Sequence, residues 1–460
     1  MVDIWSQPNA YVMPYNLTHA LTRGRRVFHQ QLLKGLSWNL LSIFFLQGSM
    51  FFTGIIVARM IGMEAFGVYA LMLMTLMTLT GVAQGSSGIV ATKFVAEGLA
   101  DKPHRVAGVL RICAVATAIG GICCSIMLWA GAPFIADEVL HKSQVEPYLH
   151  LVAIAVLFQV LIVYQHGALQ GFGAFKRLAI VSGIAGFLHF GASVIGAAVN
   201  GLEGAVQGLV VAAIGRAIVT SFILRQTLAE HGIQRSSSMN KEEWRQIWTF
   251  ALPSTLAGYV TLPCLWAVTI FVARQTDGLA WSALFLVSHQ IKQAVLQLPA
   301  LLNVVSFSAL SRAKGQRDKV GFREIFISGF VISFGFIALV AAIIAVIAPE
   351  ILSLFGHNFI EGVTLLRILL LAAVLETVAS FTYQLVQSRG RMWHSFFIIL
   401  VPRDVGYLVF TVTGVTIWGL NGAGVAYLAS HAAGLLLTLF VLRLTRIPAI
   451  INSSFKLKST

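Results

Sequence analysis

Apolar residues run along this chain in twelve long stretches that are separated by short polar links. Each stretch has about 20 residues or more, the length that an α-helix needs to cross the hydrocarbon core of a bilayer. The pattern therefore predicts an all-α polytopic membrane protein with twelve transmembrane helices. The predicted spans are 36–57, 66–90, 107–130, 149–170, 178–199, 202–224, 248–271, 279–303, 324–347, 363–386, 394–417 and 419–441.

The longest polar link lies at the midpoint of the chain and is rich in serine. It indicates a linker between two halves of six spans each. We expect a cytoplasmic N-terminal segment at 1–34, a six-helix bundle at 35–224, a cytoplasmic linker at 225–247, a second six-helix bundle at 248–441 and a cytoplasmic tail at 442–460. The segment 1–34 is too polar and too long for the start of a cleavable signal peptide, so we expect the first span to remain.

The two halves repeat each other at a nearly constant offset. The Val-Ala-Arg run at 57–59 matches the one at 272–274, and Gly-Leu-Glu-Gly-Ala at 201–205 matches Gly-Leu-Asn-Gly-Ala at 419–423. Because each half has an even number of spans, the halves share one orientation in the membrane. This predicts a parallel repeat about an axis along the membrane normal, a design in which transporters place a site between the halves.

Composition excludes the soluble classes. The 460 residues are 57% hydrophobic and 11% charged, whereas a typical soluble domain carries about 25% charged residues. The 32 Lys and Arg residues outnumber the 18 acidic residues and give a net charge of +14. Of these 32, 25 fall in links on one side, and the links on the other side hold Arg59, Lys142 and Arg274. This positive-inside pattern places both termini in the cytoplasm and removes the reason to expect a nucleic-acid partner. The four cysteines lie in apolar stretches without metal-ligand spacing, so we expect no metal site, no disulfide framework and no cofactor.

Five charged residues lie deep inside predicted spans: Arg216, Lys292, Glu376, Arg403 and Asp404. A charge near the bilayer centre costs about 2.5–3.5 kcal/mol on insertion scales, so each should face a partner or a cavity. Arg403 and Asp404 are adjacent, so their side chains should point about 100° apart and not simply pair. We expect His189 and His431, which stand alone in apolar stretches, to be packed histidines.

Two spans of the second half carry polar stripes at helical spacing. The stripe on span eight contains Ser282, His289, Lys292, Gln293 and Gln297, and the stripe on span ten contains Glu376, Ser380, Tyr383, Gln384 and Gln387. Such a stripe either joins neighbouring helices or lines a wet cavity, and the long lysine favours the cavity. In the first half, span four has Gln159, His166 and Gln170 at the positions that correspond to 376, 383 and 387.

These patterns define the candidate site. The candidates for the substrate cavity are Arg216, Lys292, Arg403, His289, Gln293, Gln297, Tyr383, Gln384, Gln159 and His166. The candidates for ion coupling are Glu376 and Asp404, because a carboxylate can take up a proton or a cation. The alternative for Glu376 is a structural pair with Arg403 or Arg367.

At this point the chain resembles the polysaccharide-transporter (O-antigen flippase) family of the MOP exporter superfamily. The resemblance rests on the six-plus-six arrangement, on Arg-Met-Ile-Gly-Met-Glu-Ala-Phe-Gly-Val-Tyr at 59–69, on Lys-Phe-Val-Ala-Glu at 93–97 and on Gln-Gly-Phe-Gly-Ala-Phe-Lys at 170–176. It implies a non-enzymatic flippase that moves undecaprenyl-pyrophosphate-linked oligosaccharide across the bacterial cytoplasmic membrane by alternating access. Lys292 would then be a point charge for the diphosphate, with H⁺ or Na⁺ as coupling ion, and membrane lipid and polysaccharide-assembly proteins as partners.

Two other functions compete with this interpretation. The first is a multidrug or other MOP-type exporter. A site for apolar cations should be rich in carboxylates and aromatic residues, whereas the charges inside these spans lean positive. A membrane-embedded glycosyltransferase or polymerase would need a long external loop with catalytic residues, and the longest external segment here is only 132–150. A flippase for the peptidoglycan lipid precursor usually has two further spans.

Overall fold

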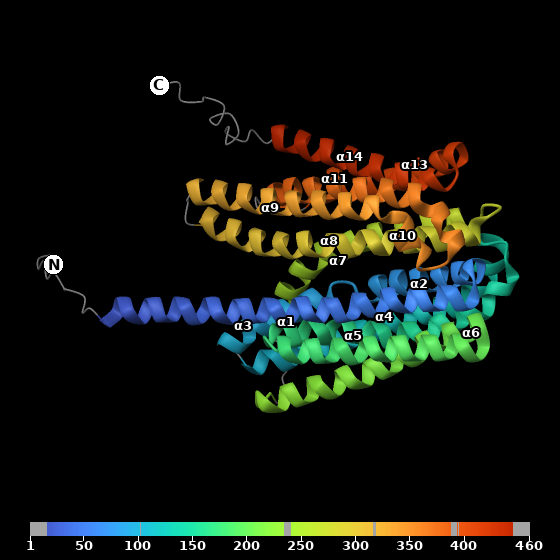
Figure 1. Cartoon of the computed structure of the whole chain (residues 1–460). Helices are drawn as coiled ribbons and strands as arrows, with labels where there is room; N and C mark the ends of the chain where they lie inside the picture. Colours follow the sequence, from blue (N-terminus) through green and yellow to red (C-terminus); the bar gives the residue numbers. More distant parts are fainter. Residues whose placement is uncertain are drawn as a thin grey trace, which may run out of the picture.

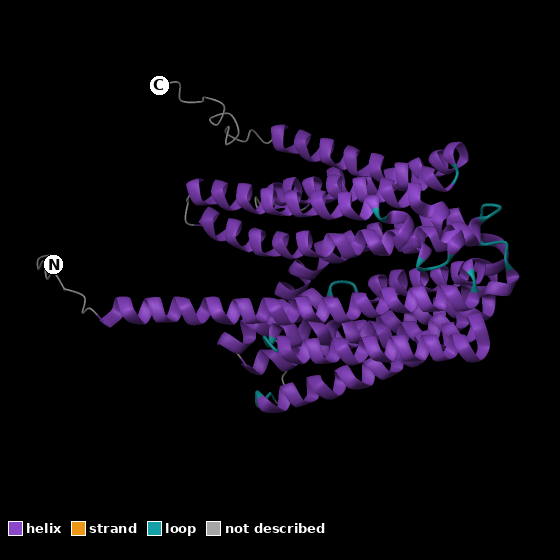
Figure 2. Cartoon of the chain, viewed as in Figure 1, coloured by secondary structure: helices purple, strands orange, loops and turns teal. Residues whose placement is uncertain are grey.

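The computed structural model describes residues 16–101, 103–233, 241–315, 319–387, 393 and 395–444. Within these ranges the chain is helical and contains no β-strand (Figure 2). The helices of the first half are α1 (Asn16–Ile61), α2 (Met63–Gln84), α3 (Ser87–Asp101), α4 (Pro103–Phe134), α5 (Glu146–Gly171) and α6 (Phe175–Glu230), with the short turns η1 (Ile135–Val139) and η2 (Ser143–Val145) between α4 and α5. The second half contains α7 (Lys241–Ala273), α8 (Gly278–Gly315), α9 (Lys319–Val346), α10 (Ala348–Ser353), η3 (His357–Gly362), α11 (Val363–Gln387), η4 (Ser395–Leu400), α13 (Val401–Trp418) and α14 (Leu420–Leu444).

Helices occupy all twelve predicted spans in the described part of the chain. Nine helical segments there are long and apolar enough to cross a membrane. One of them, α6, contains two crossings, because its helix is interrupted at Asn200 and Gly201, where Gly201 has a φ of 55°. The helices α7 and α8, which carry more polar residues, complete the set. Helices α1–α6 form one bundle and α8–α14 the other, while α7 packs against both α2 and α13 (Figure 1).

In each half, the last two membrane crossings pack very closely where one ends and the next begins. A Cβ atom on Gly196 would lie 2.0 Å from the carbonyl oxygen of Gly204, and one on Gly422 would lie 1.9 Å from that of Gly414. These two contacts are related by the same offset that links the run at 201–205 to the run at 419–423. Small residues allow membrane helices to approach each other in this way. The internal repeat of the sequence is therefore also a repeat of packing.

The two halves are joined at the end of the molecule that lies opposite the start of α1 and the end of α14 (Figure 1). Arg59 of α1 donates from Nε to the carbonyl oxygen of Leu354 at 2.6 Å. Arg274, which follows α7, lies with its Nη2 2.6 Å from Nε2 of His141 in the first half. The repeat relates Arg59 to Arg274, so each half contacts the other through an arginine at the corresponding position.

One predicted span is shorter than expected, and three helices extend beyond their predicted spans. Helix α1 begins at Asn16, so helical structure extends from the predicted span at 36–57 back through the polar residues before it. The second predicted span ends at Gly85, whose φ of 55° separates α2 from α3. At the centre of the chain α6 continues to Glu230 and α7 begins at Lys241, so helices extend into both ends of the predicted linker at 225–247.

Candidate functional site

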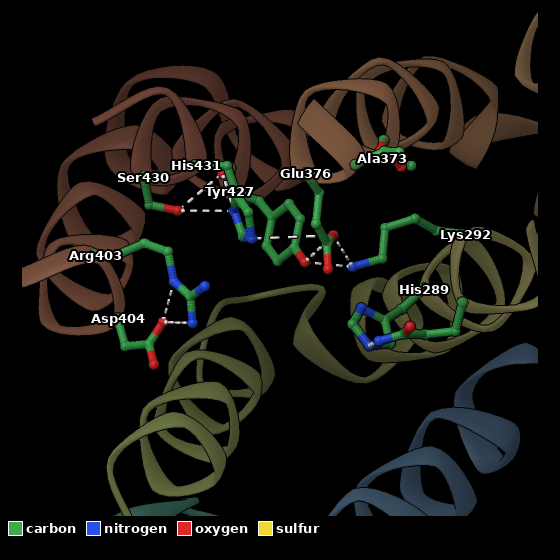
Figure 3. Close-up of polar contacts among 11 residues, drawn as sticks. His289, Lys292, Ala373, Glu376, Arg403, Asp404, Tyr427, Ser430 and His431 are labelled. Atoms are coloured by element: carbon green, nitrogen blue, oxygen red, sulfur yellow. Dashed lines mark hydrogen bonds and ion pairs between the residues drawn. The ribbon is translucent and has the colours of Figure 1, made fainter. Parts of the chain in front are cut away.

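A buried ion pair in the second bundle joins three helices (Figure 3). Lys292 of α8 is fully buried, and its Nζ donates to the hydroxyl of Tyr427 of α14 at 2.6 Å. That hydroxyl donates in turn to Oε2 of Glu376 of α11 at 2.7 Å, and the lysine and glutamate atoms themselves are 3.6 Å apart. The ammonium group also lies 3.9 Å from the centroid of the Tyr427 ring, where a cation is attracted by the ring face. In this conformation Lys292 is therefore neutralised from within the protein and does not line an open cavity.

His431 of α14 borders the same carboxylate. Its Nε2 lies 3.9 Å from Oε2 of Glu376, and its ring lies against Tyr427 with the centroids 4.2 Å apart. Its Nδ1 lies 3.0 Å from the carbonyl oxygen of Tyr427, so in the neutral ring Nδ1 donates and Nε2 is an acceptor. His431 is therefore buried and packed, as expected, and it also lies next to the Glu376 carboxylate, because one helical turn separates it from a tyrosine that reaches α11.

A second ion pair lies within α13, and a hydrogen bond connects it to α7. Arg403 places Nε and Nη2 each 2.7 Å from Oδ1 of Asp404, and the other carboxylate oxygen accepts from the hydroxyl of Thr261 at 2.5 Å. The expectation that the adjacent residues cannot pair was therefore wrong, because the long arginine side chain spans the angle between them. Tyr407, one turn further along α13, meets the ring of Tyr427 edge to face at 5.2 Å.

Part of the polar stripe of α8 lines a small pocket of about 140 Å³ beside Glu376. Its polar lining residues are Gln293, Gln297, Glu376, Thr377 and Ser380, drawn from α8 and α11. Of the other stripe residues, His289 is buried against Phe285 and lies 3.3 Å from the amide nitrogen of Gln293. The two predicted polar stripes therefore meet at this pocket.

The first bundle holds a separate polar cluster. Arg216 of α6 donates from Nη1 to the amide oxygen of Gln159 of α5 at 3.4 Å. The buried Nε of Arg216 and Nε2 of His166 have no hydrogen-bond partner among the described residues. His166 and His189 both lie within range of the charge of Arg216. The structure thus joins Gln159 to Arg216, and His166 lies two turns further along α5.

The remaining candidates lie elsewhere. Tyr383 packs against the small apolar cluster around Val386 and Ile399, two turns from Glu376, and the side chain of Gln384 lies outside the described residues. Arg367 donates to the carbonyl oxygen of Ala345 at 3.0 Å and is not the partner of Glu376. Tyr427 and Thr261 were missed, because each is a single polar residue in an apolar stretch, with partners more than 130 positions away on one side.

Solved structures share this architecture. An inward-facing multidrug resistance transporter of the MATE family, MOP superfamily, superposes with a TM-score of 0.76 at 18% identity, covering 89% of this chain and 97% of that one. The lipid II flippase MurJ in an inward closed conformation gives 0.67 at 13% identity, over 88% and 87% of the two chains. A MOP superfamily transporter from Pyrococcus furiosus gives 0.66 at 17% identity, over 90% and 96%. The chain thus has the fold of the MOP superfamily.

Sequence comparison gives the family. Residues 32–314 match the family described as "Polysaccharide biosynthesis protein", and the chain belongs to that family. The EPS I polysaccharide export inner membrane protein EpsE of Ralstonia solanacearum is 28% identical over 184 residues, which are 40% of this chain and 41% of that protein. The protein of the same name from Ralstonia nicotianae is 26% identical over 157 residues, 34% and 36% of the two chains. The match therefore spans about two fifths of the length of these relatives. The resemblance inferred from the sequence is confirmed at the level of family and fold.

Proposed function

We propose that this protein is a flippase that moves a lipid-linked oligosaccharide, attached through undecaprenyl pyrophosphate, from the inner to the outer leaflet of the bacterial cytoplasmic membrane for surface polysaccharide export. Membership of the polysaccharide biosynthesis family supports this proposal, and so do relatives named for polysaccharide export. The observation that carries it is the balance of charge deep in the membrane. Three cations, Arg216, Lys292 and Arg403, stand there against the carboxylates of Glu376 and Asp404.

The sign of this balance separates an anionic lipid from a cationic drug. An exporter of apolar cations would need an excess of carboxylates to receive its cargo, whereas a diphosphate needs cationic groups that offset the loss of hydration. Polar side chains such as Gln293 and Gln297, which line the pocket next to Glu376, supply donors and acceptors for sugar hydroxyls. The balance therefore favours the flippase over the multidrug exporter.

Movement would follow alternating access between the two bundles. The crossing contacts of Arg59 and Arg274 hold the bundles together at one end, which by the positive-inside pattern is the outer end. The lipid tail would stay in the bilayer while the head group passes between the halves. A membrane potential that is negative inside favours outward movement of an anion by about 2.3 kcal/mol per charge per 100 mV.

Glu376 is the proposed coupling residue. A proton or Na⁺ taken up by its carboxylate would weaken its pull on Lys292 and on the Tyr427 hydroxyl, both of which it now holds. Because α8, α11 and α14 meet at this point, a change of charge there alters the packing of three helices at once. Asp404, which holds Arg403 and Thr261, is a second candidate of the same kind.

Deletion of the gene tests the function. In a strain that makes the corresponding surface polysaccharide, the deletion should cause lipid-linked oligosaccharide to accumulate on the cytoplasmic side, and wild-type protein should reverse this. An unchanged pool of lipid-linked oligosaccharide, combined with greater sensitivity to cationic drugs, would support the multidrug exporter instead. Loss of the lipid-linked intermediate altogether would point to a glycosyltransferase.

A further inference from the structure

The three intramembrane cations differ in how they are neutralised. In the second bundle Lys292 lies 3.6 Å from Glu376, and Arg403 lies 2.7 Å from Asp404. Each of these cations therefore has its own carboxylate. In the part of the chain that the structure describes, Arg216 has no carboxylate within ion-pair distance, and its hydrogen-bond contact is the amide oxygen of Gln159 at 3.4 Å.

The charge of Arg216 cannot be lost by deprotonation. A guanidinium group stays protonated in proteins, unlike a lysine, which can become neutral when it is buried. Its Nε is buried without a hydrogen-bond partner among the described residues. Nε2 of His166 on α5 is also buried and also has no such partner there. The first bundle thus holds a permanent cation and two buried nitrogen atoms without hydrogen-bond partners among the described residues. These groups could bind an anion.

The internal repeat also shows that the two bundles differ in how an arginine is neutralised. In the register set by the runs at 201–205 and 419–423, the position in α14 that corresponds to Arg216 is Gly434. A Cβ atom on Gly434 would lie 3.1 Å from Cγ and Cδ of Arg403, so the stem of Arg403 packs against the corresponding place in the second bundle. Both bundles thus have an arginine there, but the second supplies the counter-ion from the protein, at Asp404, and the first supplies none that the structure describes.

We propose that the phosphate group of the lipid-linked substrate binds in the first bundle, at the guanidinium group of Arg216, with Gln159 and His166 beside it. This assignment rests on the proposed flippase function and moves the phosphate away from Lys292, where the sequence had placed it. The guanidinium group can bind phosphate oxygens through two parallel N–H donors, and a neutral His166 can add Nε2–H as a further donor. The two neutralised ion pairs of the second bundle are then free to respond to the coupling ion.

Binding of farnesyl diphosphate to the purified full-length protein tests this directly. Arg216→Gln should weaken binding by about tenfold or more, and Arg216→Lys should retain part of it, because lysine keeps the charge and loses the paired geometry. Arg177→Gln is the matched control: Arg177 is also on α6 but pairs with Glu230 and with the hydroxyl of Thr227, and its loss should leave the affinity unchanged. Farnesol, which lacks the diphosphate, should show no difference among the variants.

A second measurement does not depend on the folding of any variant. A photoreactive farnesyl diphosphate should label wild-type protein on the α5 and α6 peptides that carry residues 159–166 and 216. Labelling confined to α8, α11 and α14, or equal binding by wild type and Arg216→Gln, would overturn the assignment and leave the flippase function standing. Inorganic pyrophosphate that binds as tightly as farnesyl diphosphate would show a site for a free anion and would overturn the lipid-linked assignment. If instead farnesyl diphosphate binding depends on Arg216 while gene deletion leaves the lipid-linked pool unchanged, the anion site stands and the flippase function fails.

Discussion

Replacing Glu376 by Gln should destabilise the protein through Lys292. The substitution keeps the shape of the side chain and an acceptor for the Tyr427 hydroxyl, but it removes the negative charge 3.6 Å from a fully buried ammonium group. Removing one partner of a buried pair costs about 3–5 kcal/mol. Because the side chain of Glu376 is 24% exposed, we expect a cost of about 3 kcal/mol, at the lower end of that range. The first half has Gln159 at the corresponding position, but no lysine in the described part of the chain is paired with it, so its presence there does not show that the second half tolerates a glutamine.

A double-mutant cycle isolates the pair. The free energies of unfolding of Glu376→Gln, Lys292→Met and the double variant should be measured in one detergent by denaturant titration. The double variant buries no unpaired charge and should recover part of the loss, which gives a coupling energy of about 1 kcal/mol or more. Glu203→Gln is the control, because that carboxylate is exposed, and its replacement should change stability by less than about 0.5 kcal/mol. A Glu376→Gln protein as stable as wild type, with no coupling in the cycle, would refute this account of the ion pair.

Three further results are expected. Lys292→Ala should lower polysaccharide export measured per molecule of folded protein, since it also breaks the buried pair with Glu376 and so lowers stability, and Lys292→Arg should keep part of the export; full export by the alanine variant would rule out a role for this charge. Replacing Arg59 and Arg274 together by Gln should loosen the outer contacts, so that a cysteine at the buried Phe355 reacts several-fold faster with a membrane-impermeant thiol reagent, and an unchanged labelling rate would count against the crossing contacts. Gly204→Leu should separate the two crossings of α6 and cost about 3 kcal/mol or more, measured as a lower unfolding midpoint, because even a Cβ atom there would lie 2.0 Å from a carbonyl oxygen.

The twelve crossings could be predicted from sequence because each satisfies a length that the bilayer imposes. The repeat was equally readable, since short runs such as Val-Ala-Arg at 57–59 and 272–274 survive at a constant offset. The full length of α1 could not be predicted, because its first turns are polar and hydropathy does not distinguish a polar helix from a loop. Hydropathy predicts what lies in the membrane, and it says little about helical structure beyond it.

The sequence predicted several residues of the candidate site, but it did not predict which of them form ion pairs. Lys292, Glu376, Arg216 and Gln159 stood out because charged and amide groups are costly in lipid. Which cation meets which carboxylate depends on how α8, α11 and α14 pack, and sequence spacing within one helix carries no information on that. Tyr427 gave no signal of its own, although its hydroxyl bridges the ion pair.

The central claim is that this chain moves lipid-linked oligosaccharide across the membrane, and translocation in proteoliposomes tests it most directly. A fluorescent lipid-linked oligosaccharide would be followed by a membrane-impermeant quencher, with and without a membrane potential across the vesicles. The account predicts that vesicles with the protein transfer the labelled lipid between leaflets much faster than protein-free vesicles, and faster still when the compartment into which it moves is positive. Equal rates with and without the protein would contradict it.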